Sequence, residues 1–154
     1  MTTIDIYQGN QIGGCVTVIT ATKGGETHRI MIDYGESLPG CDNTEDFEYP
    51  WEEAPVDAVF FTHYHGDHVG RIMDIPGNIP LYIGETARKV MLNIHEYLRY
   101  IDGPEGEIHK REYELLSDDN RIHTFHYDTV KRCFVSAGQK SPFRGGKKTP
   151  IQGD

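Results

Sequence analysis

The sequence is poor in cysteine, and the few cysteines it has are badly placed for crosslinking. Cys15, Cys41 and Cys133 are odd in number, lie far apart and form no Cys-x-x-Cys pair. This pattern argues against both a disulfide framework and a zinc site made of thiolates. We expect these residues to be small buried or surface thiols.

Long apolar runs are missing as well. No stretch approaches the roughly 18–20 apolar residues that a membrane-spanning helix needs. The first five residues, Met-Thr-Thr-Ile-Asp, lack the basic start and the apolar run of a signal peptide. We therefore expect a cytoplasmic protein that makes no contact with a membrane.

Positive charge is scarce and unevenly distributed. The 154 residues carry 15 Lys and Arg against 24 Asp and Glu, a net charge of −9. Residues 131–154 hold six Lys and Arg and one Asp, so residues 1–130 carry a net charge of −14. This balance opposes non-specific binding to nucleic acid or to an anionic membrane.

The order of predicted elements indicates a mixed α/β fold. Short β-branched or alternating segments predict strands at 4–7, 15–20, 28–33, 56–62 and 81–83, and one or two more within 121–136. A short helix is expected at 69–74 and a longer one at 85–101, with Val90, Ile94, Tyr97, Leu98 and Ile101 on its apolar face. Residues 34–55 resemble a surface loop anchored by Tyr49 and Trp51, and 105–120 fit no single element.

We expect one folded domain over residues 1–130 and a basic tail over 131–154. From Ala137 onward the sequence is rich in Gly, Lys, Pro and Ser and has no periodicity. Such a composition is typical of disordered segments.

Three histidines and an aspartate crowd into Thr62-His63-Tyr64-His65-Gly66-Asp67-His68. Residues two apart on an extended segment point the same way, so His63 and His65 can face one metal ion. Gly66 is expected to permit a sharp turn that brings Asp67 and His68 to the same cavity. Imidazole and carboxylate suit Zn²⁺, Fe²⁺ or Mn²⁺. A histidine-rich surface loop without a metal is the alternative.

Two such cations about 3.5–4 Å apart would share a water and lower its pKa. Asp67 is well placed in the sequence to orient or deprotonate that water, so it is the predicted catalytic residue. The chemistry implied is the hydrolysis of an ester, phosphoester, amide or thioester.

The segment from Thr62 to Gly70 resembles the His-x-His-x-Asp-His signature of the metallo-β-lactamase superfamily. Asp33-Tyr34-Gly35 is similar to the Asp-x-Gly that ends a strand in that superfamily, and Gln11 to Cys15 resembles the start of ribonuclease J-like members. The resemblance covers roughly residues 4–101, about two thirds of the chain.

The resemblance implies an αββα sandwich with two metal ions, most simply Zn²⁺, at one edge. It implies that His63 and His65 bind the first ion and that Asp67 and His68 bind the second. Asp33 would then accept a hydrogen bond and orient one of these ligands. If Asp33 has no such role, it is a turn residue after a strand.

The resemblance also implies a later His, a bridging Asp and a further His, which are not found where they are expected. The first should fall near Cys133–Ala137, where no histidine stands. His123 and His126 come early, and we expect them to be partly exposed polar residues rather than substitute ligands. His28, His95 and His109 are expected to be ordinary surface or helix residues.

We therefore expect only the N-terminal half of the sandwich, as in a truncated chain, with an apolar sheet face that a second copy or a partner covers. Three functions remain open: a metal-dependent hydrolase acting on RNA or a small phosphoester, an inactive metal-binding protein, and a fragment that docks a partner.

Overall fold

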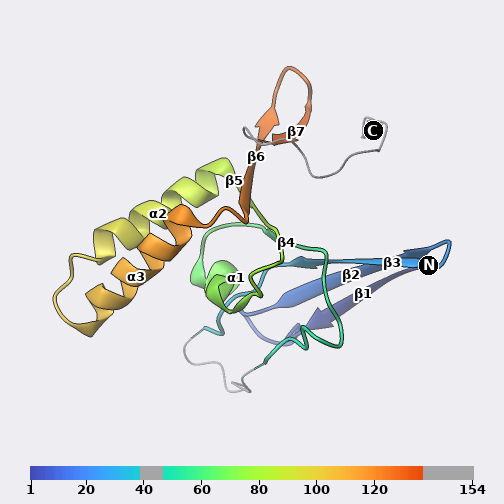
Figure 1. Cartoon of the computed structure of the whole chain (residues 1–154), viewed down its shortest axis with the longest axis horizontal. Coiled ribbons are helices and arrows are strands. Elements are labelled where there is room, and N and C mark those ends of the chain that lie inside the picture. Colours follow the sequence, from blue (N-terminus) through green and yellow to red (C-terminus); the bar gives the residue numbers. More distant parts are fainter. Residues whose placement is uncertain (39–46, 137–154) are drawn as a thin grey trace.

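The computed structural model describes residues 1–38 and 47–136, and these residues form a mixed α/β fold (Figure 1). The strands are β1 (Thr2–Tyr7), β2 (Val16–Lys23), β3 (Glu26–Ile32), β4 (Ala58–Phe61), β5 (Leu81–Gly84), β6 (Ile122–Asp128) and β7 (Cys133–Ser136). The helices are α1 (Gly66–Val69), α2 (Glu85–Leu98) and α3 (Pro104–Asp118), with a 3₁₀ turn, η1 (Ile72–Asp74).

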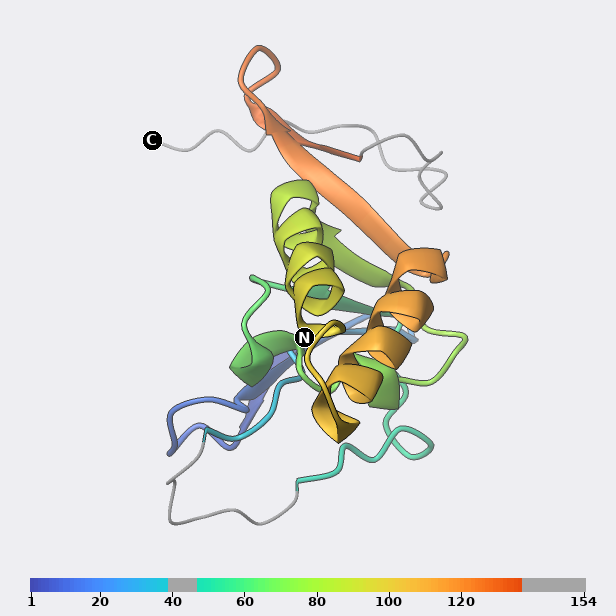
Figure 2. The same ribbon diagram turned by 90° about the vertical axis from the view of Figure 1, so that its left-hand side faces the viewer.

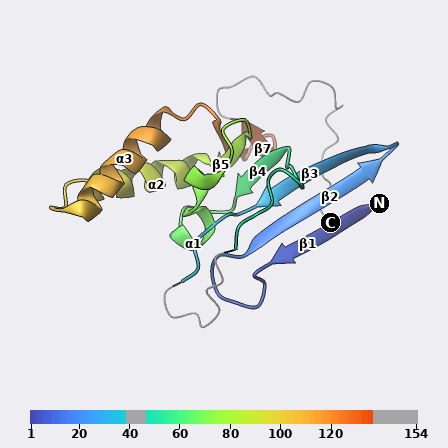
Figure 3. The ribbon, with the colours of Figure 1, turned by 60° about the horizontal axis from the view of Figure 1, so that its bottom comes forward.

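The seven strands form one sheet in which spatial order follows chain order. β1, β2 and β3 pair antiparallel, so the predicted hairpin between the second and third strands is confirmed. β3, β4, β5 and β6 are parallel to one another, and β7 returns antiparallel to β6. Figure 3 shows the long β1–β3 ribbons at one end and the paired helices at the other. The parallel pairing of β3 with β4 matters for function, because it brings the carboxyl ends of these two strands to the same edge of the sheet.

The core is assembled from β-branched and aromatic side chains of the central strands. Met31, Val59, Leu81 and Ile83 are fully buried and share one face of the sheet, because paired residues and alternate residues of a strand point the same way. The predicted aromatic anchor of the loop after β3 is confirmed for Tyr49. Its exposed fraction is 2%, and it packs edge-on against Trp51 with the ring centres 4.8 Å apart.

Helices α2 and α3 lie side by side, and α2 packs on β5 and β6 (Figure 2). The predicted helix at 85–101 forms but ends at Leu98. Residues 105–120, which the sequence left undecided, belong to α3. Pro104 opens α3 where a missing N–H costs nothing, after Gly103 with φ of 98°.

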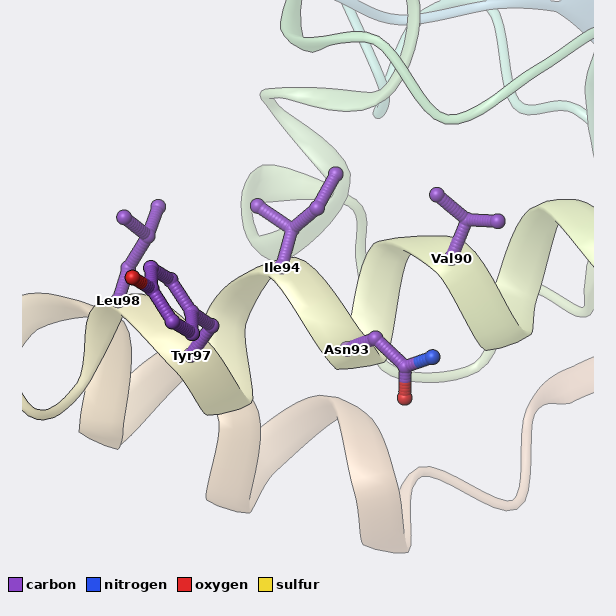
Figure 4. Close-up of a pocket in the computed structure, with 5 residues that line it drawn as sticks. All are labelled: Val90, Asn93, Ile94, Tyr97 and Leu98. Atoms are coloured by element: carbon purple, nitrogen blue, oxygen red, sulfur yellow. The ribbon is translucent and has the colours of Figure 1, made fainter.

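The predicted apolar face of α2 is wrong in detail. Met91 is the buried residue of the helix, whereas Ile94 and Tyr97 are 40% and 78% exposed. Figure 4 shows Val90, Ile94 and Leu98 along one side of α2, where they line a pocket of ≈290 Å³. Helical periodicity identified the helix, but the neighbour on which it packs decided which side is covered.

Part of the predicted tail belongs to the sheet. Cys133–Ser136 pairs with Phe125–Asp128 as strand β7, which confirms the expectation of one or two strands within 121–136, and the sheet therefore continues past residue 131. β-propensity and pairing with β6 outweigh the basic charge of Lys131 and Arg132. The prediction of disorder beyond residue 136 lies outside the described residues.

One region of the sheet presents an apolar hollow of ≈630 Å³. Side chains of β3 to β7 line it, including Ile32, Phe60, Phe125 and Phe134. Phe134 is 69% exposed. The described residues thus form one sheet and one helical layer, half of the αββα sandwich that the sequence led us to expect. Within 1–38 and 47–136, no helix has the length and apolar character needed to cross a membrane.

Candidate metal centre

The histidine cluster follows strand β4 directly and lies beside the end of β3. β3 and β4 are parallel, with Ile32 opposite Phe60. The residue after each strand therefore emerges at the same edge of the sheet: Asp33 from β3, Thr62 and His63 from β4. This edge is where open parallel sheets commonly bind ligands.

Asp33 is the buried acceptor of this edge, with an exposed fraction of 6%. Its Oδ1 accepts a hydrogen bond from the backbone N of Thr62 at 2.7 Å. Its Oδ2 accepts one from Thr62 Oγ1 at 2.8 Å and lies 2.9 Å from His68 Nδ1. A carboxylate that faces Nδ1 favours the tautomer with its proton on that atom, so His68 Nε2 keeps a free lone pair.

His68 Nε2 points to the second carboxylate of the site, lying 3.4 Å from Asp67 Oδ2. The ring of His63 lies close by, with its centre 3.9 Å from that of His68. One ligand atom from each of His63, Asp67 and His68 lies within 4.8 Å of the other two. These three half-buried residues could hold one metal ion.

His65 does not belong to that group, although its ring centre is 4.8 Å from that of His63. The group therefore combines members of the two pairs that the sequence argument kept separate. His65 is exposed and lines a cavity on the side of α2 and α3. Its role as a ligand stays a prediction.

The loop is held by backbone contacts from two segments. Tyr34 N donates to His68 O and Glu36 N donates to Gly66 O, at 2.9 and 3.0 Å, while Gly14 N donates to Asp67 O at 3.0 Å. The loop lies so close to Gly35 that a Cβ there would sit 2.1 Å from the carbonyl of Asp67. The Asp-x-Gly segment thus supplies both the acceptor Asp33 and the space for the loop.

The expectation that Gly66 is needed for a sharp turn is wrong. Gly66 is the first residue of α1, and a Cβ added there would meet no atom within 4 Å. The loop turns because a short helix begins at this point. A Cβ would overlap backbone atoms at Gly35, on the neighbouring segment, and at Gly70, just after the short helix.

Four of the five histidines outside the loop divide into two sets. The ring of His123 packs against that of Tyr82 at a tilt of 35°, and His126 Nδ1 lies 3.5 Å from Glu85 Oε2. Neither belongs to a candidate metal group among the described residues. His95 and His109, expected to be ordinary, instead form a second group with Glu112. The i, i+3 spacing of His109 and Glu112 could have signalled this group only after residues 104–118 were known to be helical.

The arrangement at the strand ends has the chemistry of a metal centre. It offers two imidazoles and a carboxylate, a set suited to Zn²⁺ and similar ions. A carboxylate that holds the far nitrogen of a ligating histidine, as Asp33 does for His68, is the usual support of such ligands.

Comparison with models of known protein families gives a match. The family model described as the metallo-beta-lactamase superfamily matches residues 13–130, which is more than half of the chain. The match includes the strand ends and the histidine loop described above. No curated protein matches the chain.

Proposed function

The chain belongs to the metallo-β-lactamase superfamily, and from this premise we propose that it hydrolyses a phosphoester or another ester or amide bond with a metal-activated water. The observation that carries the proposal is the continuous series Asp33–His68–Asp67, with separations of 2.9 and 3.4 Å. Because Asp33 holds the proton on Nδ1, the Nε2 lone pair of His68 faces Asp67 and can bind a metal ion together with that carboxylate. An exposed histidine without a metal would need no such support.

The residues present fit a metal ion of the zinc class. His63, Asp67 and His68 would hold it, with His65 as the further predicted ligand. A bound ion would lower the pKa of a water and offset negative charge that develops on the substrate. We propose Zn²⁺ as the ion, and Mn²⁺ and Fe²⁺ remain alternatives that share these ligands.

The protein's own groups have separate roles in this proposal. Asp33 fixes the ring of His68, and Thr62 anchors Asp33 through its backbone N and its hydroxyl. Asp67 is the carboxylate that accepts the proton of the attacking water. Its side chain is 20% exposed, so solvent can reach it.

The finer proposal is a ribonuclease J-like activity on RNA or on a small phosphoester. Its support is the segment from Gln11 to Cys15, which lies against the histidine loop. Gln11 Nε2 donates to Ser37 Oγ at 3.0 Å, and Gly14 N donates to Asp67 O. The charge of −14 on residues 1–130 opposes RNA, so a small phosphodiester is the first substrate to test.

The test combines elemental analysis with turnover of bis(p-nitrophenyl) phosphate. Metal-free protein should be inactive, and Zn²⁺ or Mn²⁺ should restore turnover. Asp67→Asn should lower kcat by about 10²–10⁴-fold, the contribution of a positioned proton acceptor, and should also weaken metal binding, because Asp67 is one of the proposed ligands, so kcat is compared at saturating metal. His28→Ala is the matched control, since His28 also lies beside a carboxylate, Asp57, but is exposed. Absence of turnover in either ion would contradict catalysis.

The second candidate function is metal binding without turnover. It is favoured by the small number of ligands, because the strand-end group comprises three residues within the described part of the chain, enough for one metal ion rather than two. The variant His63→Ala/His65→Ala should then lose the metal of the strand-end group without altering any reaction. Activity that disappears in this double variant would exclude the second candidate.

A third candidate function is association through the apolar hollow, and we propose a second copy of the chain as its occupant. None of the described residues lining the hollow is charged, so two copies could meet there without the repulsion that a net charge of −9 causes elsewhere. Sedimentation velocity should show a dimer that Phe134→Glu dissociates. A monomer at all concentrations would contradict this proposal.

A further inference from the structure

Helices α2 and α3 bring a second set of metal-ligating side chains together, away from the strand-end site. His95 comes from the last turn of α2, and His109 and Glu112 lie one turn apart on α3. The three side chains are 20%, 21% and 32% exposed. Each helix therefore turns a polar group inward at the seam where apolar residues are normally expected.

The three ligand atoms form a nearly equilateral triangle. His95 Nδ1 lies 3.1 Å from Glu112 Oε2, His109 Nδ1 lies 3.3 Å from the same oxygen, and the two Nδ1 atoms are 3.3 Å apart. Zinc bonds to N and O ligands of roughly 2.0–2.1 Å give about 3.3–3.4 Å between neighbouring ligands of a tetrahedron. The triangle thus has nearly the dimensions of one tetrahedral face.

Hydrogen bonding alone satisfies this cluster incompletely. A carboxylate oxygen is an acceptor, and the two Nδ1 atoms can hydrogen-bond to each other only if one of them carries no proton, which sets its lone pair against Glu112. If both Nδ1 atoms carry a proton, both can donate to Glu112. The two N–H groups then face each other across 3.3 Å. A cation in place of the two protons removes that conflict, because both nitrogens and the oxygen then direct lone pairs at one centre.

The electrostatic surroundings favour a cation. The cluster lines a cavity of ≈310 Å³ together with Glu36 and His65. Among the described residues that line this cavity, none is Lys or Arg.

We propose that His95, His109 and Glu112 form a second divalent-metal site of the zinc class, independent of the histidine loop. Two histidines and a glutamate are a ligand set of catalytic zinc sites, which keep the fourth position open. The three residues line the same cavity as His65, so a small ligand of this metal would lie in the cavity that His65 also lines. The proposal does not rest on the hydrolytic function.

The experiment uses Co²⁺ as the probe, because tetrahedral Co²⁺ absorbs visible light. The full chain is stripped with a chelator and titrated in the background His63→Ala/His68→Ala, which removes the strand-end group. One equivalent of Co²⁺ should still bind. Adding Glu112→Gln should weaken this binding at least tenfold, and His109→Gln should do the same. Two separate variants are used so that misfolding of one, monitored by circular dichroism, does not hide the answer.

The matched control is His126→Ala. His126 also lies beside a glutamate, Glu85, but the pair is 49% and 36% exposed and belongs to no candidate metal group among the residues that the structure describes. This variant should leave Co²⁺ binding unchanged. A background variant that binds no Co²⁺, or binding that Glu112→Gln and His109→Gln leave intact, would overturn the proposal.

The two metal proposals fail in different ways. In the single variant Glu112→Gln, in which the histidine loop is unchanged, any metal that still binds is bound at the strand-end site. If His63→Ala/His68→Ala removes all metal from the protein, the strand-end site stands and the second site falls. If the double variant keeps its full equivalent and the wild type binds no more than one, the second site stands and the hydrolytic proposal falls.

Discussion

The sharpest test of the strand-end site is Asp33→Asn, which keeps the shape of the side chain and removes its charge. Asp33 has φ of 60°, a left-handed conformation that Asn tolerates better than most residues. Alanine would add backbone strain, so Asn isolates the effect of the carboxylate. An amide oxygen can still accept from Thr62 N, but the amide NH₂ then faces Thr62 Oγ1 and His68 Nδ1.

Two effects of known size follow from that exchange. The charge-assisted bond to His68 is lost, which should lower the free energy of unfolding of the metal-free protein by about 1.5–3 kcal/mol. His68 must now accept at Nδ1, so its proton moves to Nε2 and blocks the lone pair beside Asp67. Loss of such support typically weakens metal binding 10–100-fold, or about 1.4–2.7 kcal/mol.

The assays are urea unfolding of the metal-free protein and Zn²⁺ competition with a chromophoric chelator, in the Glu112→Gln background. Asp57→Asn is the matched control. Asp57 Oδ2 also accepts from a backbone N, that of Arg29, and faces a histidine Nδ1, that of His28. That pair is exposed, so its loss should cost less than about 1 kcal/mol and leave metal affinity unchanged. A folded Asp33→Asn variant with the affinity of the wild type would refute the role of Asp33.

Gly35→Ala should destabilise the protein by about 1–3 kcal/mol or more, because the new Cβ would overlap the Asp67 carbonyl. Gly66→Ala is the control and should be tolerated. Equal melting temperatures for the two variants would contradict the contact between Gly35 and the loop. Arg121→Ala should lower the free energy of unfolding by about 1–3 kcal/mol, since Arg121 Nη1 donates to the carbonyls of residues 75 and 76 at 3.1 and 2.9 Å. An unchanged midpoint of urea unfolding would count against a stabilising role of Arg121. Burial raises the pKa of Asp119, but hydrogen bonds from Arg121 outweigh burial and leave the pKa below its ordinary 3.8. A carboxylate with a lowered pKa stabilises the folded state above pH 3.8, and this stabilisation is lost as the pH falls through the pKa of the folded state. The difference in free energy of unfolding between wild type and Asp119→Asn should therefore shrink below pH 3.8 and stay constant above it.

Much of the sheet could be predicted because its signals are local. The alternation in β1, the β-branched run of β2 and the buried run of β4 each identify a strand without knowledge of its neighbours. Helix α3 could not be identified in this way. Its sequence is highly charged, and Leu116 is the one large apolar residue it buries fully among the described residues, so its apolar face is too weak to show as a pattern.

The site shows the same division between local and distant information. The spacing of His63, Asp67 and His68 in one loop made them predictable as a group. Which nitrogen faces which carboxylate depended on Asp33, which is 35 residues from His68 in sequence. The need for glycine at Gly35 rather than Gly66 likewise depends on a contact between distant segments.

The sequence by itself determined the superfamily, the strands that build the sheet and the loop that concentrates the histidines, because each depends on residues near one another along the chain. Only the tertiary structure decided that Asp33 holds His68 and that His95 meets His109 and Glu112. These contacts arise from the parallel pairing of β3 with β4 and the packing of α2 on α3. Both are interactions between segments that lie far apart in the sequence, so local sequence patterns do not reveal them.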